Sequence, residues 1–539
     1  MLFKQRRFLG LVCIVSVMAL ILTGCGGPSG PKETAGQQII RYNASAEPQT
    51  LDPGMATGIP EMTIINAMFE GLTRYNNKNE PAPGIAESWT ISPDGLTYTF
   101  KLRDARWSNG DPVTAQGFVD GWLRALDPKL ASEYAYQLYY IKGAEEYNTG
   151  KGSDKDVAAK ALDDKTLQVI LKAPSPQFLG LTSFQTLFPV NSKVVSAHPD
   201  WIASPENYIG NGPFKMVSWD HNQVIKCVKN PNYWDAANVK LDELHFYLVD
   251  NNTTGFNMFK AGQLDIQYNV PIQEIAGLKG NPEFKIMPNM SSYFYRFNVT
   301  KKPFNDPRVR RALALAIDRQ AIVRDVCKGE QLPAYAYIPF GVPEPGGGDF
   351  RKTGGDFFRE DLDQARELLA GAGYPDGKGF PAVSIMYNNN DQHKAIAEAI
   401  QAMWKKNLNI NVTLQNKEWQ TYLNDMQNLN YDIVRASWTP DYMDAMTFAD
   451  MFVTDGGNNL TGWSNKEYDR LIDAAKSTDA GNPKARVEDM HRSESILMEE
   501  MPIMPVYFYT QPILIKSSLK NVIIPPFGLE AEFKWAYVE

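Results

Sequence analysis

The sequence of 539 residues has little of what most catalytic and metal sites require. It contains four cysteines and five scattered histidines, and no C-x-x-C pair or other metal-ligand spacing occurs. The motifs of phosphate-binding loops, zinc proteases and serine hydrolases are also missing. We therefore expect neither an enzyme nor a cofactor. A glycosidase-type pair of distant carboxylates stays open, because sequence spacing does not reveal it.

Basic charge is scarce as well. The chain carries 54 Lys and Arg against 62 Asp and Glu, a net charge of −8, whereas nucleic-acid binders normally present a basic patch. We expect no nucleic-acid partner. With 43% hydrophobic and 12% aromatic residues, the composition excludes a disordered chain. At about 150 residues per domain, the length predicts three domains, or two lobes of which one is discontinuous.

The one long apolar run lies at residues 8–22, directly after the cations Lys4, Arg6 and Arg7. It is shorter than the about 20 residues of a spanning helix. We therefore predict a signal peptide over 1–24, with an uncleaved anchor as the alternative.

The signal segment ends in LTGC at 22–25, which resembles the bacterial lipobox. This resemblance implies that Cys25 is lipidated and becomes the new N-terminus. The following stretch up to residue 38 is rich in Gly and Pro and predicts a flexible tether over 25–38. We expect an exported protein, anchored by lipid to the cell membrane and facing the periplasm or the cell exterior.

Two cysteines remain in the body of the chain, Cys227 and Cys327. A large core does not need a disulfide, so we favour two buried thiols, with a disulfide as the alternative.

The body alternates strand-like and helix-like stretches, typical of an α/β fold. Thr114 is placed to cap a helix ending near Leu126, after a turn at Asn109-Gly110. A strand is predicted over 97–102, and a hairpin over 214–219 and 223–229.

The clearest pattern runs strand, helix, strand, helix, strand over 383–387, 392–406, 410–415, 418–426 and 431–438. It predicts right-handed βαβ crossovers and a largely parallel sheet. Ligands bind such sheets beyond the carboxyl ends of the strands, here after Tyr387 and around Trp438.

Several long strings are similar to the family 5 extracellular solute-binding proteins of ABC transporters, from about residue 39 to the C-terminus. They are LDP at 51–53, FEGL at 69–72, WSNGDPVTA at 107–115, NPNYW at 230–234 and PFNDPRVR at 303–310. LPAY at 332–335 and WKKNL at 404–408 look like the oligopeptide-binding branch.

The resemblance implies the periplasmic-binding-protein-like type II fold, in which two lobes comprising three domains close on a ligand cleft. Domain I would combine 39–69, 194–290 and 509–539. Domain II would span 70–193 and domain III 291–508.

The resemblance also implies how a short peptide would be held. Asp441 matches the family aspartate that pairs with the peptide amine; from the sequence alone, an N-cap of a helix starting near Tyr442 is the alternative. Residues 436–439, including Ser437, Trp438 and Thr439, would run beside the peptide as an added strand. Thr57, Gly58 and Ile59 would approach from the opposite lobe.

Further positions follow from the same resemblance. Arg435 and His393 match basic positions that meet the peptide carboxylate, although His393 could equally be a helix-start residue. The resemblance also shows three departures: Arg296 stands where a relative has an acidic residue, Cys327 where relatives have a basic one, and Ser291 and Thr439 where some relatives have a disulfide. The positions that match side-chain pockets are Trp419, Trp438, Tyr134, Tyr268 and Phe294, with a place in the core as the alternative. Asn269 follows Tyr268 and is placed to hydrogen-bond within the same pocket.

The expected function is that of a monomeric receptor that delivers short peptides to a membrane-embedded ABC permease with its ATPase subunits. Other family 5 ligands remain alternatives: a dipeptide, a murein peptide, a metal chelate or an oligosaccharide. A surface lipoprotein that senses peptides is another.

Overall fold

The computed structural model describes residues 38–345 and 347–539. The predicted signal peptide and the tether up to residue 37, with Cys25, lie outside these residues. Within them, no helix combines the length and apolarity needed to cross a bilayer.

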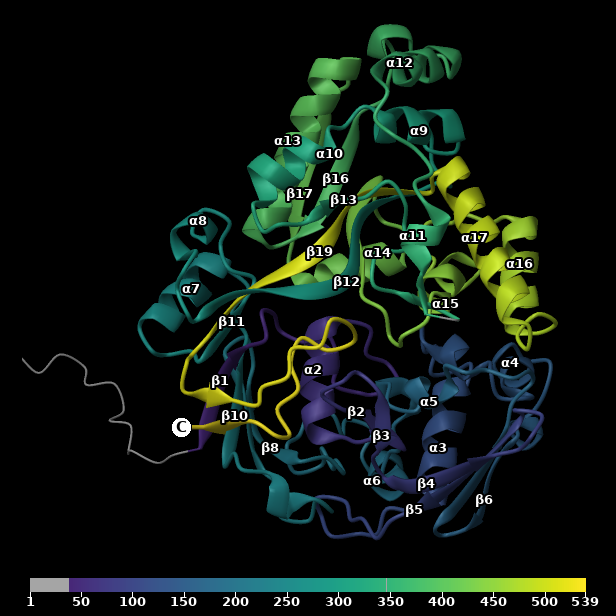
Figure 1. Cartoon of the computed structure of the whole chain (residues 1–539), viewed down its shortest axis with the longest axis vertical. Helices are drawn as coiled ribbons and strands as arrows, with labels where there is room; N and C mark the ends of the chain where they lie inside the picture. Colours follow the sequence, from purple (N-terminus) through teal and green to yellow (C-terminus); the bar gives the residue numbers. More distant parts are fainter. Residues whose placement is uncertain (1–37, 346) are drawn as a thin grey trace, which may run out of the picture. The chain divides into compact units, whose positions relative to one another are not determined.

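A large mixed sheet forms the centre of the fold (Figure 1). Its strands in spatial order are β17 (Val412–Lys417), β16 (Val383–Asn388), β18 (Ile433–Trp438), β12 (Phe284–Phe297), β19 (Ile503–Ile515), β11 (Ile266–Tyr268), β1 (Ile39–Asn43), β10 (Glu243–Tyr247), β9 (Val224–Lys229) and β8 (Phe214–Asp220), with β13 (Leu332–Pro333) also paired to β19.

The predicted α/β unit is confirmed. β16 pairs in parallel with both β17 and β18, and the helices between them are α13 (Asp391–Leu408) and α14 (Trp419–Gln427). The hairpin of β8 and β9 is confirmed too, because the two strands pair antiparallel.

Beyond this unit the sheet is mixed rather than largely parallel: β1 pairs in parallel with β10 and β11, whereas the other pairings are antiparallel. β12 and β19 are 14 and 13 residues long and pair antiparallel with each other. β12 also runs antiparallel to β18. The reason is the path of the chain: β12 leads from β11 to β18, and β19 returns along the same line, so the two must run in opposite directions (Figure 1).

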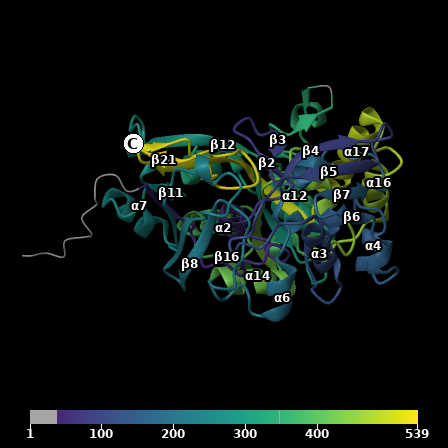
Figure 2. The same cartoon turned by 90° about the horizontal axis from the view of Figure 1, so that it is seen from below.

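A second, four-stranded antiparallel sheet has the order β4 (Ala86–Ile91), β5 (Thr97–Leu102), β7 (Thr166–Ile170) and β6 (Ala159–Asp163). Figure 2 shows these strands near α3 (Ala115–Leu126). The hydroxyl of Thr114 accepts the backbone N–H of Gly117, and Gly110 occupies the turn with a φ of +94°. The predicted strand, turn and capped helix are all confirmed.

Other helices cover the sheets and complete the core. They are α2 (Ile59–Met68), α4 (Ala144–Asn148), α5 (Phe178–Leu181), α6 (Ser192–Ala197), α7 (Asn252–Lys260), α8 (Ile275–Leu278), α9 (Pro307–Leu315), α10 (Arg319–Ala321), α11 (Phe350–Gly354), α12 (Leu362–Gly371), α15 (Met446–Ala449), α16 (Lys466–Lys476) and α17 (Pro483–Glu500). Short two-stranded sheets join β2 (Thr73–Tyr75) to β3 (Pro81–Pro83), β14 (Pro343–Glu344) to β15 (Gly348–Asp349), and β20 (Leu519–Lys520) to β21 (Tyr537–Val538).

Cys227 and Cys327 are buried free thiols, which confirms the favoured reading. The boundaries of the three domains stay a prediction, and the names domain I, II and III are used below in that sense.

Candidate functional site

Two neighbouring cavities lie where β18 ends. The larger has a volume of about 310 Å³ and the smaller about 90 Å³. Together they form the candidate binding site, called the cleft below. Residues that line both are Ile59, Trp419, Arg435, Ser437 and Thr439.

Asp441 lies three residues beyond β18 and is buried, with 4% of its surface exposed. Its carboxylate accepts hydrogen bonds from the Tyr134 hydroxyl at 3.3 Å and the Gln137 amide at 2.8 Å, both from the predicted domain II. The backbone N–H of Asp441 donates to the Thr447 hydroxyl at 3.1 Å. Among the described residues, no cation lies within ion-pair distance of this carboxylate.

Burial raises the pKa of Asp441 well above its ordinary value, and the nearby carboxylate of Asp450 raises it further. A positive charge placed beside Asp441 would reverse this effect. The alternative role of Asp441 as a helix N-cap is wrong, because the next helix begins at Met446 with Ala445 at its N-cap.

Arg435 projects from β18 into the larger cavity. Its Nη2 donates to the Tyr509 hydroxyl at 2.7 Å and to the Ser437 hydroxyl at 3.1 Å. The guanidinium carbon lies 4.9 Å from the centre of the Tyr293 ring. These neutral partners fix the orientation of the guanidinium but leave its charge uncompensated, so the group is prepared to meet an anion.

His393 lies in the first turn of α13, where the Asn390 side chain accepts its backbone N–H, and it also lines the larger cavity. The helix-start position of His393 is therefore confirmed, and its contact with a peptide carboxylate stays a prediction. Burial, followed by the charge of Arg435, lowers the pKa of His393 well below its ordinary value. The ring is neutral here and offers hydrogen bonds rather than charge.

One edge of β18 is open along the cleft. β12 pairs with β18 as far as Trp438. On the other side, the pairing with β16 includes only Ile433 and Val434. From Arg435 onward, the backbone facing β16 has no strand partner in that ladder, so an extended chain can add there as a new strand.

The segment 57–59 meets Trp419 across the cleft. Gly58 is the N-cap of α2, and a Cβ at this position would lie 3.0 Å from the Trp419 ring. The indole N–H of Trp419 donates to the buried carboxylate of Glu61 at 3.2 Å. Only a glycine allows this close approach without displacing the ring or Glu61.

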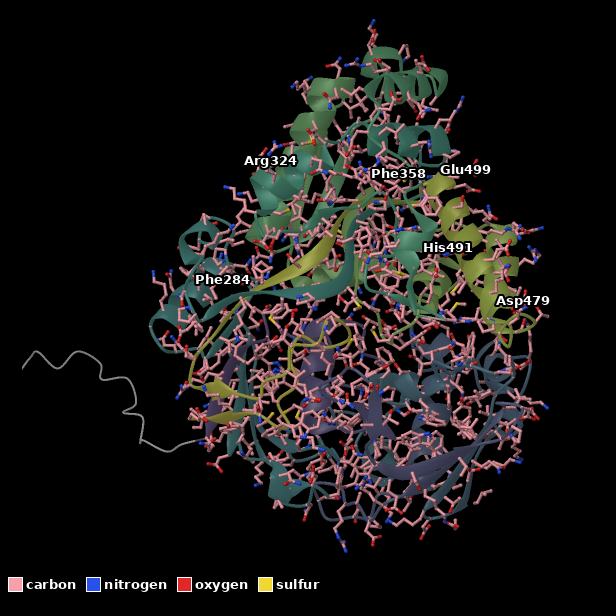
Figure 3. All side chains as sticks on the ribbon, in the orientation of Figure 1. Phe284, Arg324, Phe358, Asp479, His491 and Glu499 are labelled. Carbon is pink, nitrogen blue, oxygen red and sulfur yellow. The ribbon has the colours of Figure 1, made fainter. Side chains whose placement is uncertain are left out.

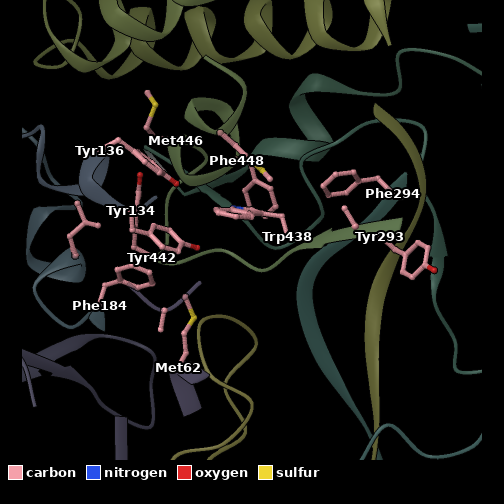
Figure 4. Packing of buried hydrophobic residues seen from close by; sticks show 14 of the residues in the cluster. Met62, Tyr134, Tyr136, Phe184, Tyr293, Phe294, Trp438, Tyr442, Met446 and Phe448 are labelled. Carbon is pink, nitrogen blue, oxygen red and sulfur yellow. The ribbon is translucent and has the colours of Figure 1, made fainter. Parts of the chain in front are cut away.

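Aromatic side chains from domains II and III meet beside Asp441. The rings of Tyr134 and Trp438 have centres 6.1 Å apart, and Figure 4 shows them close to Tyr442 and Phe184. Tyr268 and Asn269 line the larger cavity. Phe294 is completely buried against Tyr337 and lines neither cavity.

Ser291 and Thr439 lie together, as the resemblance implied for this pair of positions. Their hydroxyl oxygens are 2.7 Å apart. A hydrogen bond therefore joins β12 to the segment after β18 where a disulfide stands in some relatives.

Residues 80–459 match the sequence description of bacterial extracellular solute-binding proteins, family 5. This match covers most of the chain. The protein belongs to family 5 of the bacterial extracellular solute-binding proteins.

Two relatives from Bacillus subtilis are each 40% identical to this family 5 protein. The dipeptide-binding protein DppE aligns over 95% of this chain and 94% of its own. The oligopeptide-binding protein OppA aligns over 99% of this chain and 100% of its own. Among solved structures, Haemophilus influenzae OppA in complex with RPPGFSPFR is 33% identical with a TM-score of 0.87, covering 93% of this chain and 99% of the other.

The same comparison identifies the state of the family 5 fold seen here. The Escherichia coli murein tripeptide-binding protein MppA is 34% identical with a TM-score of 0.87, covering 94% of this chain and 99% of its own. Its unliganded open form, with 35% identity and coverage of 94% and 98%, gives only 0.63. The arrangement of this chain is therefore more similar to that MppA structure and to peptide-bound Haemophilus influenzae OppA than to the unliganded open form, and it is called closed below.

The sequence did not predict several residues that contact the predicted site residues. Gln137 contacts Asp441, Tyr509 contacts Arg435, and Glu61 contacts Trp419. Each lies more than 70 positions from its partner, so no local pattern joins them. Glu530 also lines the larger cavity and was not predicted. Burial raises the pKa of Glu530 to about 8.

Proposed function

We propose that this protein is the receptor of an ABC importer and captures short peptides in the cleft. The observation that carries the proposal is the pair of buried, uncompensated charges at the two ends of one open strand edge. Asp441 would receive the peptide amine and Arg435, with His393 nearby, the carboxylate. A zwitterionic, extended ligand has the matching charges.

Hydrogen bonds to the peptide backbone would allow the cleft to bind peptides of many different sequences. A peptide lying along residues 436–439 would exchange amide hydrogen bonds that do not depend on its side chains. Trp419, Trp438, Tyr134 and Tyr268 would surround the ligand side chains, and trapped water would fill the remaining space. The names of DppE and OppA support a peptide as the ligand.

Replacement of Asp441 tests the proposal. Asp441→Asn keeps the shape but removes the charge that pairs with the amine, so affinity for a short peptide should fall by about 10- to 100-fold, a loss of roughly 1.4 to 2.8 kcal/mol. Titration calorimetry measures this, and a peptide with an acetylated amine should bind the wild-type protein equally poorly. Unchanged affinity of the variant for the free peptide contradicts the amine role.

The cellular setting is part of the same proposal. Lipidation of Cys25 would anchor the mature chain to the membrane through the tether 25–38, beside a permease and its ATPase subunits. Cys25→Ser should then release the protein into the soluble fraction after carbonate washing. Retention of the variant in the washed membranes would contradict the lipid anchor.

Two alternatives, a receptor for a different ligand and a hydrolase, are each tested by a separate measurement. Native mass spectrometry of the protein purified without refolding should detect co-purified peptides, whereas a sugar or metal chelate would appear as another mass. Incubation with a peptide should leave that peptide intact, because the proposal includes no catalysis. Cleavage products would favour a hydrolase.

A further inference from the structure

Arg296 on β12 is a buried charge that the protein itself does not compensate. Its exposed fraction is 3%, and its Nη2 donates a hydrogen bond to the backbone carbonyl of Asn458 at 3.1 Å. Nε and Nη1 are buried without a hydrogen-bond partner. In the described part of the chain, no carboxylate lies within 4.0 Å of this guanidinium.

Three other buried arginines lie near a carboxylate, and a fourth, Arg310, donates to several backbone carbonyls instead. Arg351 pairs with Glu494 at 2.6 Å, Arg74 with Glu70 at 2.8 Å, and Arg319 lies 3.7 Å from Glu360. A buried guanidinium without an anion loses hydration without recovering an equivalent interaction. Arg296 therefore retains the capacity to bind an anion supplied from outside.

The side chain of Arg296 borders the cleft. Arg296 lines the smaller cavity together with Asp441, Trp438 and the backbone of residues 436–439. On β12 it lies opposite Val434 of β18, which places its backbone one strand away from the open edge of β18, and its side chain extends to the smaller cavity. If the ligand amine meets Asp441, a ligand side chain close to that amine would lie in the smaller cavity, near Arg296.

Glu133 is the one carboxylate besides Asp441 that lines the smaller cavity, and it already has a partner. Gln427 donates to its Oε1. Burial raises the pKa of Glu133 to about 7, although Arg296 acts in the opposite direction. Near neutral pH this group is partly protonated and offsets only part of the positive charge.

The tyrosines around Arg296 do not supply an anion either. The hydroxyl of Tyr422 donates to the carbonyl of Arg435 at 2.5 Å. That of Tyr431 donates to the carbonyl of Leu460. Tyr337 contacts the sulfur of Met451 at 2.9 Å. Because these hydroxyls already contact other groups, none of the three tyrosines provides an anionic partner for Arg296.

We propose that the smaller cavity is a subsite for an acidic ligand side chain, with Arg296 as its counter-ion. The preferred ligand class is then a peptide carrying a carboxylate side chain close to its amine end. This proposal rests on the proposed function, since it assumes that a peptide occupies the cleft.

The test compares Glu with Gln in tri-alanine peptides substituted at position one, two or three. In the wild-type protein, the Glu peptide should bind about 10-fold more tightly than the Gln peptide at one of these positions, equivalent to roughly 1.4 kcal/mol. In Arg296→Gln, this ratio should fall to about one. Calorimetry gives each affinity, and thermal melting verifies that the variant is folded.

A matched control is available on the surface. Arg324, labelled in Figure 3, is 69% exposed and pairs with Asp325. Arg324→Gln removes the same charge without touching the cleft, so its Glu to Gln ratio should equal that of the wild-type protein.

The outcomes separate the two proposals. Binding of tri-alanine with no preference for Glu at any position overturns the acidic subsite and leaves the peptide receptor standing. A preference that persists in Arg296→Gln also overturns the subsite. If none of the peptides binds, the receptor proposal fails and the subsite fails with it.

Discussion

At the scale of single residues, the cleft is defined by charges that have only neutral partners. Asp441 is held by a tyrosine and an amide, and Arg435 by a tyrosine and a serine. An uncompensated buried charge is unfavourable by several kcal/mol. Without a ligand, Asp441 lowers this cost by binding a proton, because burial raises its pKa. A fold that buries an acid and a base beside one strand edge, neither with an oppositely charged partner, gains most when a ligand of opposite end charges is bound.

Replacing Arg435 tests the carboxylate end at this scale. Arg435→Lys keeps the charge but loses the planar fork that Tyr509 and Ser437 orient. Binding of alanine peptides of three to five residues should weaken by about 10-fold at the length whose carboxylate reaches Arg435, roughly 1.4 kcal/mol. Calorimetry against each peptide measures the change.

C-terminal amides of the same peptides provide the control for Arg435. An amide has already lost the negative charge, so it should bind the variant and the wild-type protein with closely similar affinity. An equal loss for acid and amide would show that Arg435 supports the shape of the cleft rather than the charge of the ligand.

At the scale of elements, a contact between domains II and III lies beside the cleft. Lys476, the last residue of α16, pairs with buried Asp450 at 2.6 Å. Its Nζ also lies 5.3 Å and 5.9 Å from the ring centres of Tyr140 and Tyr136. Because the tyrosines belong to the opposite domain, these cation–π contacts form only when the two domains meet.

Removing the cation–π contact of Lys476 with Tyr140 should weaken ligand binding without changing a residue that lines the cleft. Tyr140→Leu removes the ring but leaves the pair of Lys476 and Asp450, so the closed state loses about 1 kcal/mol of cation–π stabilisation. Peptide affinity should fall roughly five-fold by calorimetry. Tyr140→Phe keeps the ring and serves as the control; a five-fold loss in both variants would point to the hydroxyl contact with Tyr442 instead.

Sequence patterns predicted the elements whose signals are local. The capped helix after Thr114 and the parallel unit of β16, β17 and β18 follow from periodicity and capping within short windows. The register of β12 against β19 joins Phe294 to Pro505, about 200 positions away, and no local pattern contains it. The same limit explains why Gln137 and Tyr509 were missed, whereas Asp441 and Arg435 lie just after and within the predicted strand β18 and were singled out by the family resemblance.

At the scale of the whole molecule, closure brings acidic groups out of water. Asp441 meets domain II through Tyr134 and Gln137. Glu133 of domain II meets domain III through Gln427, and its backbone touches Gly457 so closely that a Cβ there would lie 2.1 Å from the Glu133 carbonyl oxygen. Without a ligand, the closed state must therefore either bury these groups as charged carboxylates or bind protons that neutralise them.

Closure of the ligand-free protein should consequently depend on pH. Burial raises the pKa of Asp441 well above its ordinary value in the closed state and that of Glu133 to about 7. The closed state then binds more protons than the open state, so lowering the pH favours closure. For Glu133 this contribution is present below its ordinary pKa and is lost as the pH rises through about 7.

Small-angle X-ray scattering of the ligand-free protein measures this effect. The radius of gyration should be smaller at pH 5 than at pH 8, because the protonated carboxyl groups are buried at a lower free-energy cost. A saturating peptide should give the compact value at both pH values, since its amine replaces the proton at Asp441. Glu133→Gln, which is neutral at every pH, should weaken the pH dependence. A ligand-free radius that does not change between pH 5 and pH 8 would mean that desolvation of these carboxyl groups does not hold the lobes apart.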